Sequence, residues 1–143
     1  MGVAGTGKST IGALVAADLG VELIEGDDHH PPSNIEKLSS GQPLTDRDRW
    51  PWLETLARML AEEREAGRSA VLTCSALRRA YRDLLRGEIP TDEVFFVHLH
   101  GSFEVLDERM RGRRHFMPAA LLQSQLDTLE PLEADEAGVV VDV

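Results

Sequence analysis

The first residues of the chain carry a phosphate-binding pattern. Residues 2–9 read Gly-Val-Ala-Gly-Thr-Gly-Lys-Ser, which matches G-x-x-x-x-G-K-[ST] in full. Glycines let the backbone turn tightly and direct its N–H groups at a β-phosphate, while Lys8 reaches β- and γ-oxygens and Ser9 offers a hydroxyl to Mg²⁺. The helix expected next adds the positive end of its dipole. The alternative is a glycine-rich turn with an incidental lysine, but the motif is complete and a helix follows it directly. The pattern therefore predicts a P-loop, whose nucleotide contacts would come from Gly2, Ala4, Gly5, Thr6, Gly7, Lys8, Ser9 and Thr10.

A second group of reactive side chains follows a short apolar segment at residues 21–24, where Glu25, Asp27 and His30 come in close succession. A carboxylate just past a strand end can meet an acceptor hydroxyl aimed at the γ-phosphate, so Asp27 is the candidate for orienting that hydroxyl. Glu25 can hold Mg²⁺ through water. The alternative is that these acids merely solvate a turn, but beside a complete P-loop the pattern favours kinase chemistry.

Arginines gather near the C-terminal third of the chain. Four of the six residues from Arg109 to Arg114 are arginine, in a chain with only 15 Lys and Arg altogether. This run is too short for a face that binds duplex nucleic acid, and it suits the phosphates of one nucleotide. A solvated surface run is the alternative. Together with the P-loop and Asp27, the run completes what a small-molecule kinase needs.

Composition and net charge exclude several classes of protein. The 143 residues suit one domain, and the net charge of −10 repels nucleic acid and anionic membranes. No apolar run approaches the ~18 residues of a membrane span. Cys74 is the single cysteine and cannot form an internal disulfide. We therefore expect a cytoplasmic protein that acts on a small molecule and binds neither nucleic acid nor membranes.

Strands and helices alternate along the chain, as in a parallel sheet that lies between two layers of helices. Apolar residues near period 3.6 predict helices at 7–19, 33–40, 51–67, 78–86, 102–110 and 118–129. Short apolar runs predict strands at 21–24, 70–74, 94–99 and 139–141, with Cys74 buried. In the 78–86 helix we expect Tyr81, Leu84 and Leu85 inward and the arginines outward. The fold class is thus α/β, with the site at the carboxyl ends of the strands.

Both ends of the given sequence depart from this pattern. A P-loop normally follows a buried strand, yet only Met1 precedes Gly2. The last expected strand is likewise not followed by a helix. We expect the N-terminal strand and the C-terminal helix of such a fold to be absent from the chain.

Longer blocks of sequence resemble one family. They read G-D-D-H-H-P, N-I-E-K-L-S-S-G-Q-P-L-T-D-R-D-R-W-P-W-L, C-S-A-L-R-R-A-Y-R-D-L-L-R and H-F-M-P-A-A-L-L-Q-S-Q-L-D-T-L-E. These blocks are similar to the signature blocks of gluconate kinase, a P-loop small-molecule kinase, and they cover nearly the whole chain in order. The resemblance implies a three-layer fold like that of nucleoside monophosphate kinases, in a single domain over residues 1–143. It also implies ATP, Mg²⁺, transfer of the γ-phosphoryl group to the 6-hydroxyl of D-gluconate, and a homodimer.

The resemblance assigns roles position by position. It makes Lys8 and Ser9 the phosphate and metal contacts, and makes Asp27 the residue that receives or orients the acceptor proton. The sugar-acid site would draw on His30, Lys37, Arg49, Ser75, Arg78, His115 and Gln125.

Four of these assignments have plain alternatives. Arg49 suits a bidentate contact to a carboxylate, but it could instead pair with Asp46 or Asp48. His30 could cap a turn, Lys37 could be a solvated helix residue, and Gln125 could face solvent. We expect Trp50 and Trp52 to serve packing rather than substrate contact.

The arginine run falls where these kinases carry a lid, at about residues 111–120. The resemblance places Arg109 near the adenine and Arg113 near the transferring phosphate. Between Arg109 and His115 the chain is one residue shorter than the family pattern, so either Arg113 or Arg114 takes the catalytic position.

Two other functions fit parts of the sequence. The same scaffold and Asp27 would serve a kinase of another small hydroxy acid such as shikimate, but the D-R-D-R-W-P-W-L and C-S-A-L-R-R blocks favour gluconate. The second alternative is a nucleotide-dependent switch. The sequence does not favour a GTPase switch, because the N-K-x-D segment with which GTPases bind guanine does not occur.

Overall fold

The computed structural model describes residues 1–111 and 119–143. Arg113, Arg114, His115 and most of the expected lid lie outside the described residues. The helices are α1 (Lys8–Leu19), α2 (Pro32–Ser39), α3 (Asp46–Glu65), α4 (Arg79–Arg86), α5 (Phe103–Arg111) and α6 (Ala119–Thr128), with short 3₁₀ turns η1 (Gly26–His29) and η2 (Thr91–Glu93). The strands are β1 (Glu22–Glu25), β2 (Ala70–Thr73), β3 (Phe96–His100) and β4 (Gly138–Asp142). The predicted alternation of strands and helices is confirmed.

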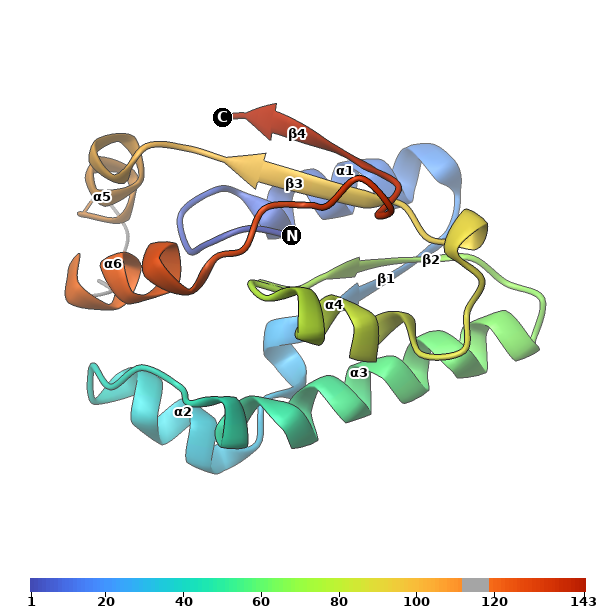
Figure 1. Cartoon of the computed structure of the whole chain (residues 1–143), viewed down its shortest axis with the longest axis horizontal. Coiled ribbons are helices and arrows are strands. Elements are labelled where there is room, and N and C mark those ends of the chain that lie inside the picture. The colour runs from blue at the N-terminus through green and yellow to red at the C-terminus, as the bar shows by residue number, and fades with distance from the viewer. Residues whose placement is uncertain (112–118) are drawn as a thin grey trace.

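The strands form two parallel pairs. β1 pairs with β2, with Glu22 beside Ala70, and β3 pairs with β4, with Phe96 beside Gly138. Figure 1 shows the N-terminus between the two pairs. Because η1 follows β1 and Ser75 comes just after β2, the carboxyl ends of this pair bring Asp27 and Ser75 to the same edge.

Helices α1 and α3 both pack against the β1–β2 pair, from opposite sides in Figure 1. α1 makes its contact through small residues, since Gly12 and Ala16 are its buried positions. A Cβ on Gly12 would lie only 2.3 Å from Cγ2 of Thr73, so the helix sits too close to β2 for any larger residue. The larger apolar side chains of α1 face away, and Leu14 is 63 % exposed.

The helix predicted from Pro51 begins five residues earlier, at Asp46. Thr45 caps it, because its hydroxyl accepts from the Asp48 N–H while the Asp48 carboxylate accepts from the Thr45 N–H at 2.8 Å. This reciprocal capping box satisfies two backbone donors and fixes the start. Pro51 therefore lies inside the helix, where the ring removes one intrahelical hydrogen bond. The effect on the site is large, since the added first turn carries Arg49.

The expectation that the arginines of α4 face outward is wrong for Arg82, which is 1 % exposed. Its guanidinium pairs with Glu136 at 2.5 and 2.8 Å and donates to the carbonyls of Glu130 and Pro131 at 3.1 and 3.0 Å. These acceptors come from the segment between α6 and β4, about 50 residues away in sequence. A buried arginine is tolerated here because its donors have partners on that segment.

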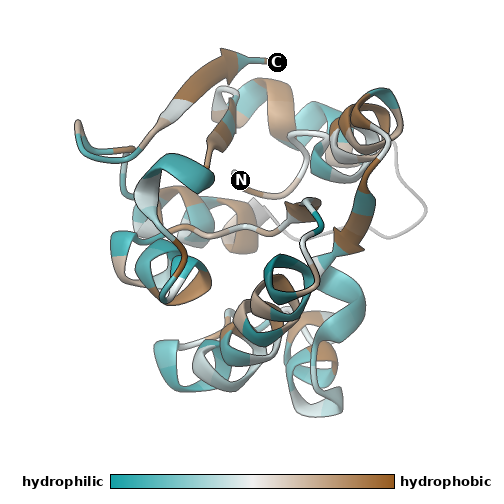
Figure 2. Ribbon diagram, turned by 90° about the vertical axis from the view of Figure 1, so that its right-hand side faces the viewer, coloured by the Kyte–Doolittle hydropathy of each residue, from teal (hydrophilic) through white to brown (hydrophobic). Residues whose placement is uncertain are grey.

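The main core lies between β2, α3 and α4 and extends to α5 and α6. It includes Leu53, Leu56, Leu77, Leu85, Leu106 and Leu122, and Cys74 is buried as predicted. Apolar side chains also remain on the surface, where β4 carries three exposed valines and Figure 2 shows this strand in brown at the edge of the molecule. Among the helices of the described residues, none is long and apolar enough to cross a bilayer.

Candidate functional site

Seven of the predicted site residues that the structure describes line one cavity of about 270 Å³. Its lining includes Lys8, Asp27, His30, Arg49, Ser75 and Gln125, together with Ala4 of the P-loop and Trp52. These residues come from the P-loop, the β1–α2 connection, α3, the end of β2 and α6. The cavity thus joins a phosphate-binding loop to a carboxylate and to a guanidinium, which are the parts that phosphoryl transfer to an anionic acceptor needs.

The P-loop has the geometry of an anion cradle. Gly5 and Gly7 adopt φ values of +84° and +88°, a region that glycine reaches without strain. Gly7 is also the N-cap of α1 and supplies no side-chain cap, so the first amides of the helix are open to an anion. Ser9 and Thr10 lie exposed on this first turn. The loop can therefore bind phosphates through its backbone.

Side chains of other elements hold the P-loop in place. Gln125 on α6 accepts a hydrogen bond from the Ala4 N–H at 2.7 Å, so its amide contacts the nucleotide loop itself. On the α5 side, a Cβ on Gly5 would lie 3.2 Å from Cγ of Met110. Within the loop, the Thr6 hydroxyl and the Lys8 ammonium both donate to the Val3 carbonyl, at 2.9 and 3.0 Å. Arg109 lies exposed on α5, next to Met110.

Asp27 lies in the 3₁₀ turn η1, and Trp52 of α3 packs against this turn. The indole Nε1 donates to the Gly26 carbonyl at 2.8 Å. The indole ring also stacks on His30, with ring centroids 4.0 Å apart and an interplanar angle of 22°. Trp52 is 2 % exposed, so its ring is a rigid surface against which the Asp27 turn is set.

His30 is oriented by Asn34, which lies four residues later in the first turn of α2. The Asn34 amide nitrogen lies 3.3 Å from His30 Nδ1 and donates to the Asp48 carbonyl at 3.0 Å. Because an amide nitrogen donates, Nδ1 accepts and the proton of the neutral ring resides on Nε2. Nε2 lies 3.8 Å from Asp27 Oδ1. Burial lowers the pKa of His30, with Asp27 opposing the shift and Arg49 adding to it, so the ring is neutral at neutral pH.

Arg49 brings a buried cation to the cavity. Its side chain is 7 % exposed, its Nε donates to the Leu44 carbonyl at 3.3 Å, and its guanidinium lies 5.6 Å from the centre of the Tyr81 ring. The two acids considered as its partners are engaged elsewhere. Asp46 accepts from Arg78 and from the Tyr81 hydroxyl, and Asp48 accepts from Lys37. Among the described residues, Arg49 has no carboxylate within ion-pair distance, which leaves it able to bind one.

Outside residues 2–10, and apart from Arg109, three predicted site residues that the structure describes do not line this cavity. Lys37 donates to both carboxylate oxygens of Asp48 at 2.7 Å, which ties α2 to the capped start of α3. Arg78 precedes α4 and pairs with Asp46 at 3.1 Å. Glu25 accepts a hydrogen bond from the Thr73 hydroxyl. These residues position neighbouring elements in this structure.

Trp52 and Asn34 contact residues of the candidate site, although the sequence indicated packing for Trp52 and did not single out Asn34. Trp52 falls in the same apolar stripe as Leu53 and Leu56, which is why the pattern indicated packing alone. Only the fold shows that its indole N–H reaches Gly26. Asn34 follows two prolines and a serine at the start of a short helix, and nothing in its spacing indicates that it contacts His30.

Replacing Trp52 with phenylalanine is expected to lower kcat about tenfold, equivalent to ~1.4 kcal/mol. The phenyl ring still stacks on His30, but the buried Gly26 carbonyl loses its donor and the Asp27 turn loosens. The free energy of unfolding should fall by about 1–2 kcal/mol in urea titrations.

Trp50→Phe provides the matched control, because Trp50 makes an edge contact to Tyr81 and, unlike Trp52, does not line the cavity. Its kcat should stay close to that of the unmodified protein. If Trp52→Phe leaves kcat unchanged while lowering stability, Trp52 serves packing alone.

Known proteins match this chain over nearly its whole length. A family described as an AAA domain matches residues 1–132. A gluconokinase of Gluconobacter oxydans is 53 % identical over 143 residues, which cover 99 % of this chain and 79 % of that protein. Among solved structures, a gluconokinase from Sinorhizobium meliloti superposes with a TM-score of 0.90 at 51 % identity, covering 100 % of this chain and 79 % of that one. A sugar kinase from a Janibacter species superposes with a TM-score of 0.92 at 54 % identity, covering 99 % of this chain and 82 % of that one.

Proposed function

Because this chain belongs to the gluconokinase family of P-loop kinases, we propose that it transfers the γ-phosphoryl group of ATP to the 6-hydroxyl of D-gluconate. The products are 6-phospho-D-gluconate and ADP. The observation that carries the proposal is the single cavity lined by Lys8 of the P-loop, by Asp27 and by Arg49. One cavity thus offers a phosphate contact, a hydroxyl acceptor and a cation for the substrate carboxylate.

The donor half of the reaction belongs to the P-loop. The open amides at the start of α1 hold the β-phosphate, and Lys8 turns from the Val3 carbonyl to the β- and γ-oxygens. A divalent cation, when bound, neutralises charge on the phosphates. The Ser9 hydroxyl and the Glu25 carboxylate are hard oxygen donors of the kind that Mg²⁺ prefers, and they would hold it.

The acceptor half rests on the residues around η1 and α3. Arg49 binds the carboxylate of gluconate through its planar guanidinium, and this fixes one end of the sugar acid. Asp27 accepts a hydrogen bond from the 6-hydroxyl and thereby directs the oxygen of that hydroxyl at the γ-phosphorus. His30 donates through Nε2 to a substrate oxygen. Since the transition state of phosphoryl transfer is loose, the value of these contacts lies mainly in positioning.

Several finer features complete the proposal. The arginine run supplies the lid over the transferring phosphate, with Arg113 or Arg114 as the catalytic cation, and His115 joins the substrate site. Mg²⁺ is the metal, the protein forms a homodimer, and it works in the cytoplasm. Lys37 and Arg78 contribute to the sugar-acid site through the capped start of α3, which carries Arg49.

The alternative acceptor, shikimate, is not favoured, because the relatives and structures reported above are named gluconokinases or a sugar kinase. The switch hypothesis fails for the same reason, since those proteins are all kinases.

A substrate panel tests the function, with ADP release as the measurement. D-Gluconate should be turned over. D-Glucitol, which has a hydroxymethyl group in place of the carboxylate, should show a kcat/KM lower by about 10- to 100-fold because the contact to Arg49 is lost. Arg49→Met should lower kcat/KM for gluconate by a similar factor and leave the glucitol value nearly unchanged.

Arg47→Met is the control, because Arg47 lies exposed in the same turn of α3 and carries the same charge. High turnover of shikimate with none of gluconate would overturn the proposed function. Equal losses in Arg47→Met and Arg49→Met would instead remove Arg49 from the site.

A further inference from the structure

Gln125 of α6 lies between the P-loop and the acceptor cavity. It lines that cavity together with Asp27 and Arg49, and it also contacts the P-loop, because its Oε1 accepts from the Ala4 N–H at 2.7 Å. Ala4 itself lines the same cavity. A single side chain therefore contacts the loop that binds the nucleotide and borders the space that the sugar acid would occupy.

The contact with Ala4 fixes the orientation of the Gln125 amide. A backbone N–H can only donate, so the atom that faces Ala4 is the oxygen, and the NH₂ group points away from this N–H. In the part of the chain that the structure describes, Nε2 of Gln125 has no hydrogen-bond partner. Its N–H groups are thus left to donate to a ligand, and the oxygens of a sugar acid are suitable acceptors.

The peptide group that Gln125 holds also holds Lys8. The Ala4 N–H and the Val3 carbonyl belong to one planar peptide unit, and in a trans unit they point in opposite directions. On the carbonyl side, the Lys8 ammonium and the Thr6 hydroxyl donate to Val3 at 3.0 and 2.9 Å. When Lys8 leaves this carbonyl for the phosphates, the contacts of Gln125 and Thr6 still hold the peptide unit. Gln125 thus restrains the part of the P-loop against which Lys8 rests before nucleotide binds.

The backbone of α6 is anchored, so the side chain of Gln125 is the part that can respond to a ligand. Leu122 is fully buried in the main core. Just after the helix, the Glu130 N–H donates to the Leu77 carbonyl at 2.7 Å, and the Glu130 carboxylate accepts from the Arg79 N–H at 2.6 Å. These contacts tie the end of α6 to the segment that follows β2. A glutamine side chain on a fixed backbone loses rotamer freedom when a ligand binds its amide.

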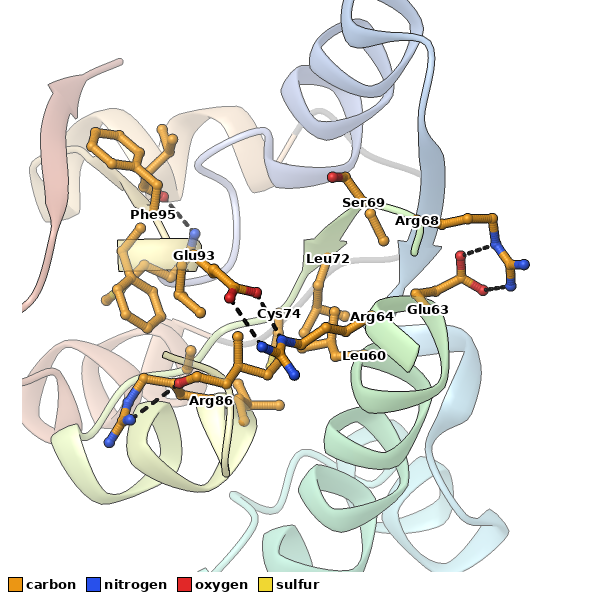
Figure 3. Close-up of a pocket in the computed structure, with 18 residues that line it drawn as sticks. Leu60, Glu63, Arg64, Arg68, Ser69, Leu72, Cys74, Arg86, Glu93 and Phe95 are labelled. Atoms are coloured by element: carbon orange, nitrogen blue, oxygen red, sulfur yellow. Dashed lines mark hydrogen bonds and ion pairs between the residues drawn. The ribbon is translucent and has the colours of Figure 1, made fainter. Parts of the chain in front are cut away.

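A second and larger cavity, of about 420 Å³, takes no part in this link. Residues of α3, β2 and β3 line it, and Figure 3 shows Leu60, Leu72 and Cys74 along its wall. Neither Lys8 nor Gln125 is among its lining residues. A ligand in that cavity would not contact Gln125, so the link between acceptor and nucleotide runs through the smaller cavity.

We propose that Gln125 is a positioning residue that couples the two substrates. Its Nε2 donates to the bound sugar acid while its Oε1 holds the Ala4 N–H, so each ligand strengthens the binding of the other. This proposal rests on the proposed function, since it takes the sugar acid as the ligand of the cavity. A sugar acid that fixes the Gln125 amide lowers the entropic cost of ordering the P-loop around a nucleotide. Linkage then requires the nucleotide to strengthen sugar-acid binding by the same factor.

Titration calorimetry of the whole chain measures this coupling, with the β,γ-imido analogue of ATP and Mg²⁺ as the nucleotide probe. Saturating D-gluconate should lower the dissociation constant of the analogue by about 5- to 20-fold, a usual size for coupling between two sites. Saturating analogue should lower the dissociation constant of D-gluconate by the same factor. In Gln125→Met, which keeps the length of the side chain but has no amide, the factor should fall to about one.

Gln123→Met is the matched control. Gln123 lies exposed on the same helix, donates to Asp127 at 2.7 Å and does not line the cavity, so this variant should keep the factor of the unmodified protein. A Gln125 that only stiffened the P-loop would give a different result. Its replacement would weaken binding of the analogue equally with and without D-gluconate, and the factor would not change.

Three results would overturn the coupling role of Gln125 while leaving the proposed function intact. They are an unchanged factor in Gln125→Met, an equal loss of the factor in Gln123→Met, and a factor of about one in an unmodified protein that binds D-gluconate. Failure of D-gluconate to bind, both alone and with the analogue, would instead overturn the proposed function, and the coupling role with it.

Discussion

Asp27→Asn is expected to lower kcat by about 10²- to 10⁴-fold, the range that a positioned acid–base group contributes. Asparagine keeps the shape of the side chain but no longer offers a carboxylate to the acceptor hydroxyl. Because the contact matters mainly in the transition state, kcat and kcat/KM should fall together. The dissociation constant of a non-hydrolysable ATP analogue should stay unchanged, since the nucleotide is bound by the P-loop.

Asp28→Asn is a closely matched control. Asp28 is the next residue in η1, it is exposed like Asp27, and its replacement removes the same charge. Asp28 does not line the cavity, so the kcat of the Asp28→Asn variant should remain within a factor of about two or three of that of the unmodified protein. If Asp27→Asn turns over normally, the orienting role passes to another acid, and Glu25 is the first to test.

The second large effect concerns stability. Arg82→Met should lower the free energy of unfolding by about 3–5 kcal/mol, because it removes the guanidinium that pairs with the buried carboxylate of Glu136 and leaves only Arg79, 3.8 Å away, as a cation. It also removes the donors that the Glu130 and Pro131 carbonyls use. Urea unfolding at neutral pH, followed by circular dichroism, measures the loss.

A double variant separates the two parts of this loss. Arg82→Met combined with Glu136→Gln removes the buried charge and should recover part of the stability, but not all of it, because the two carbonyls remain unpaired. Arg58→Met, at an exposed arginine of α3, should change stability little. An Arg82→Met variant as stable as the unmodified protein would show that water or a neighbour replaces the guanidinium.

The sequence predicted the elements well because their signals are local. Hydrophobic periodicity gave the six α-helices and short apolar runs gave the four strands of the described residues, with ends shifted by a few residues. The exception at α3 also has a local cause, since the Thr45 and Asp48 capping box outweighs Pro51 as a start signal. Arg82 could not be placed this way, because its partners lie about 50 residues later in the chain. The split into two strand pairs is likewise a tertiary property.

In the candidate site, too, local sequence signals gave some residues, whereas others depend on contacts between distant elements. A contiguous motif gave Lys8, and a strand end gave Asp27, because each depends on a few neighbouring residues. The placement of Arg49 in the cavity depends on which acids Arg78 and Lys37 occupy, and these pairs cross between elements. Trp52 could not be distinguished from packing residues, because its polar contact is made with a backbone carbonyl.

The stack of His30 on Trp52 also gives the molecule an optical signal. An imidazolium in contact with an indole quenches its fluorescence, whereas a neutral imidazole quenches it much less. Because burial lowers the pKa of His30, the stacked indole should stay bright at neutral pH and dim only on acidification. A sugar acid that donates to or accepts from His30 alters that titration. In the Trp50→Phe variant, which leaves Trp52 as the single tryptophan, the emission can therefore report occupancy of the acceptor side without any label, independently of whether phosphate is transferred.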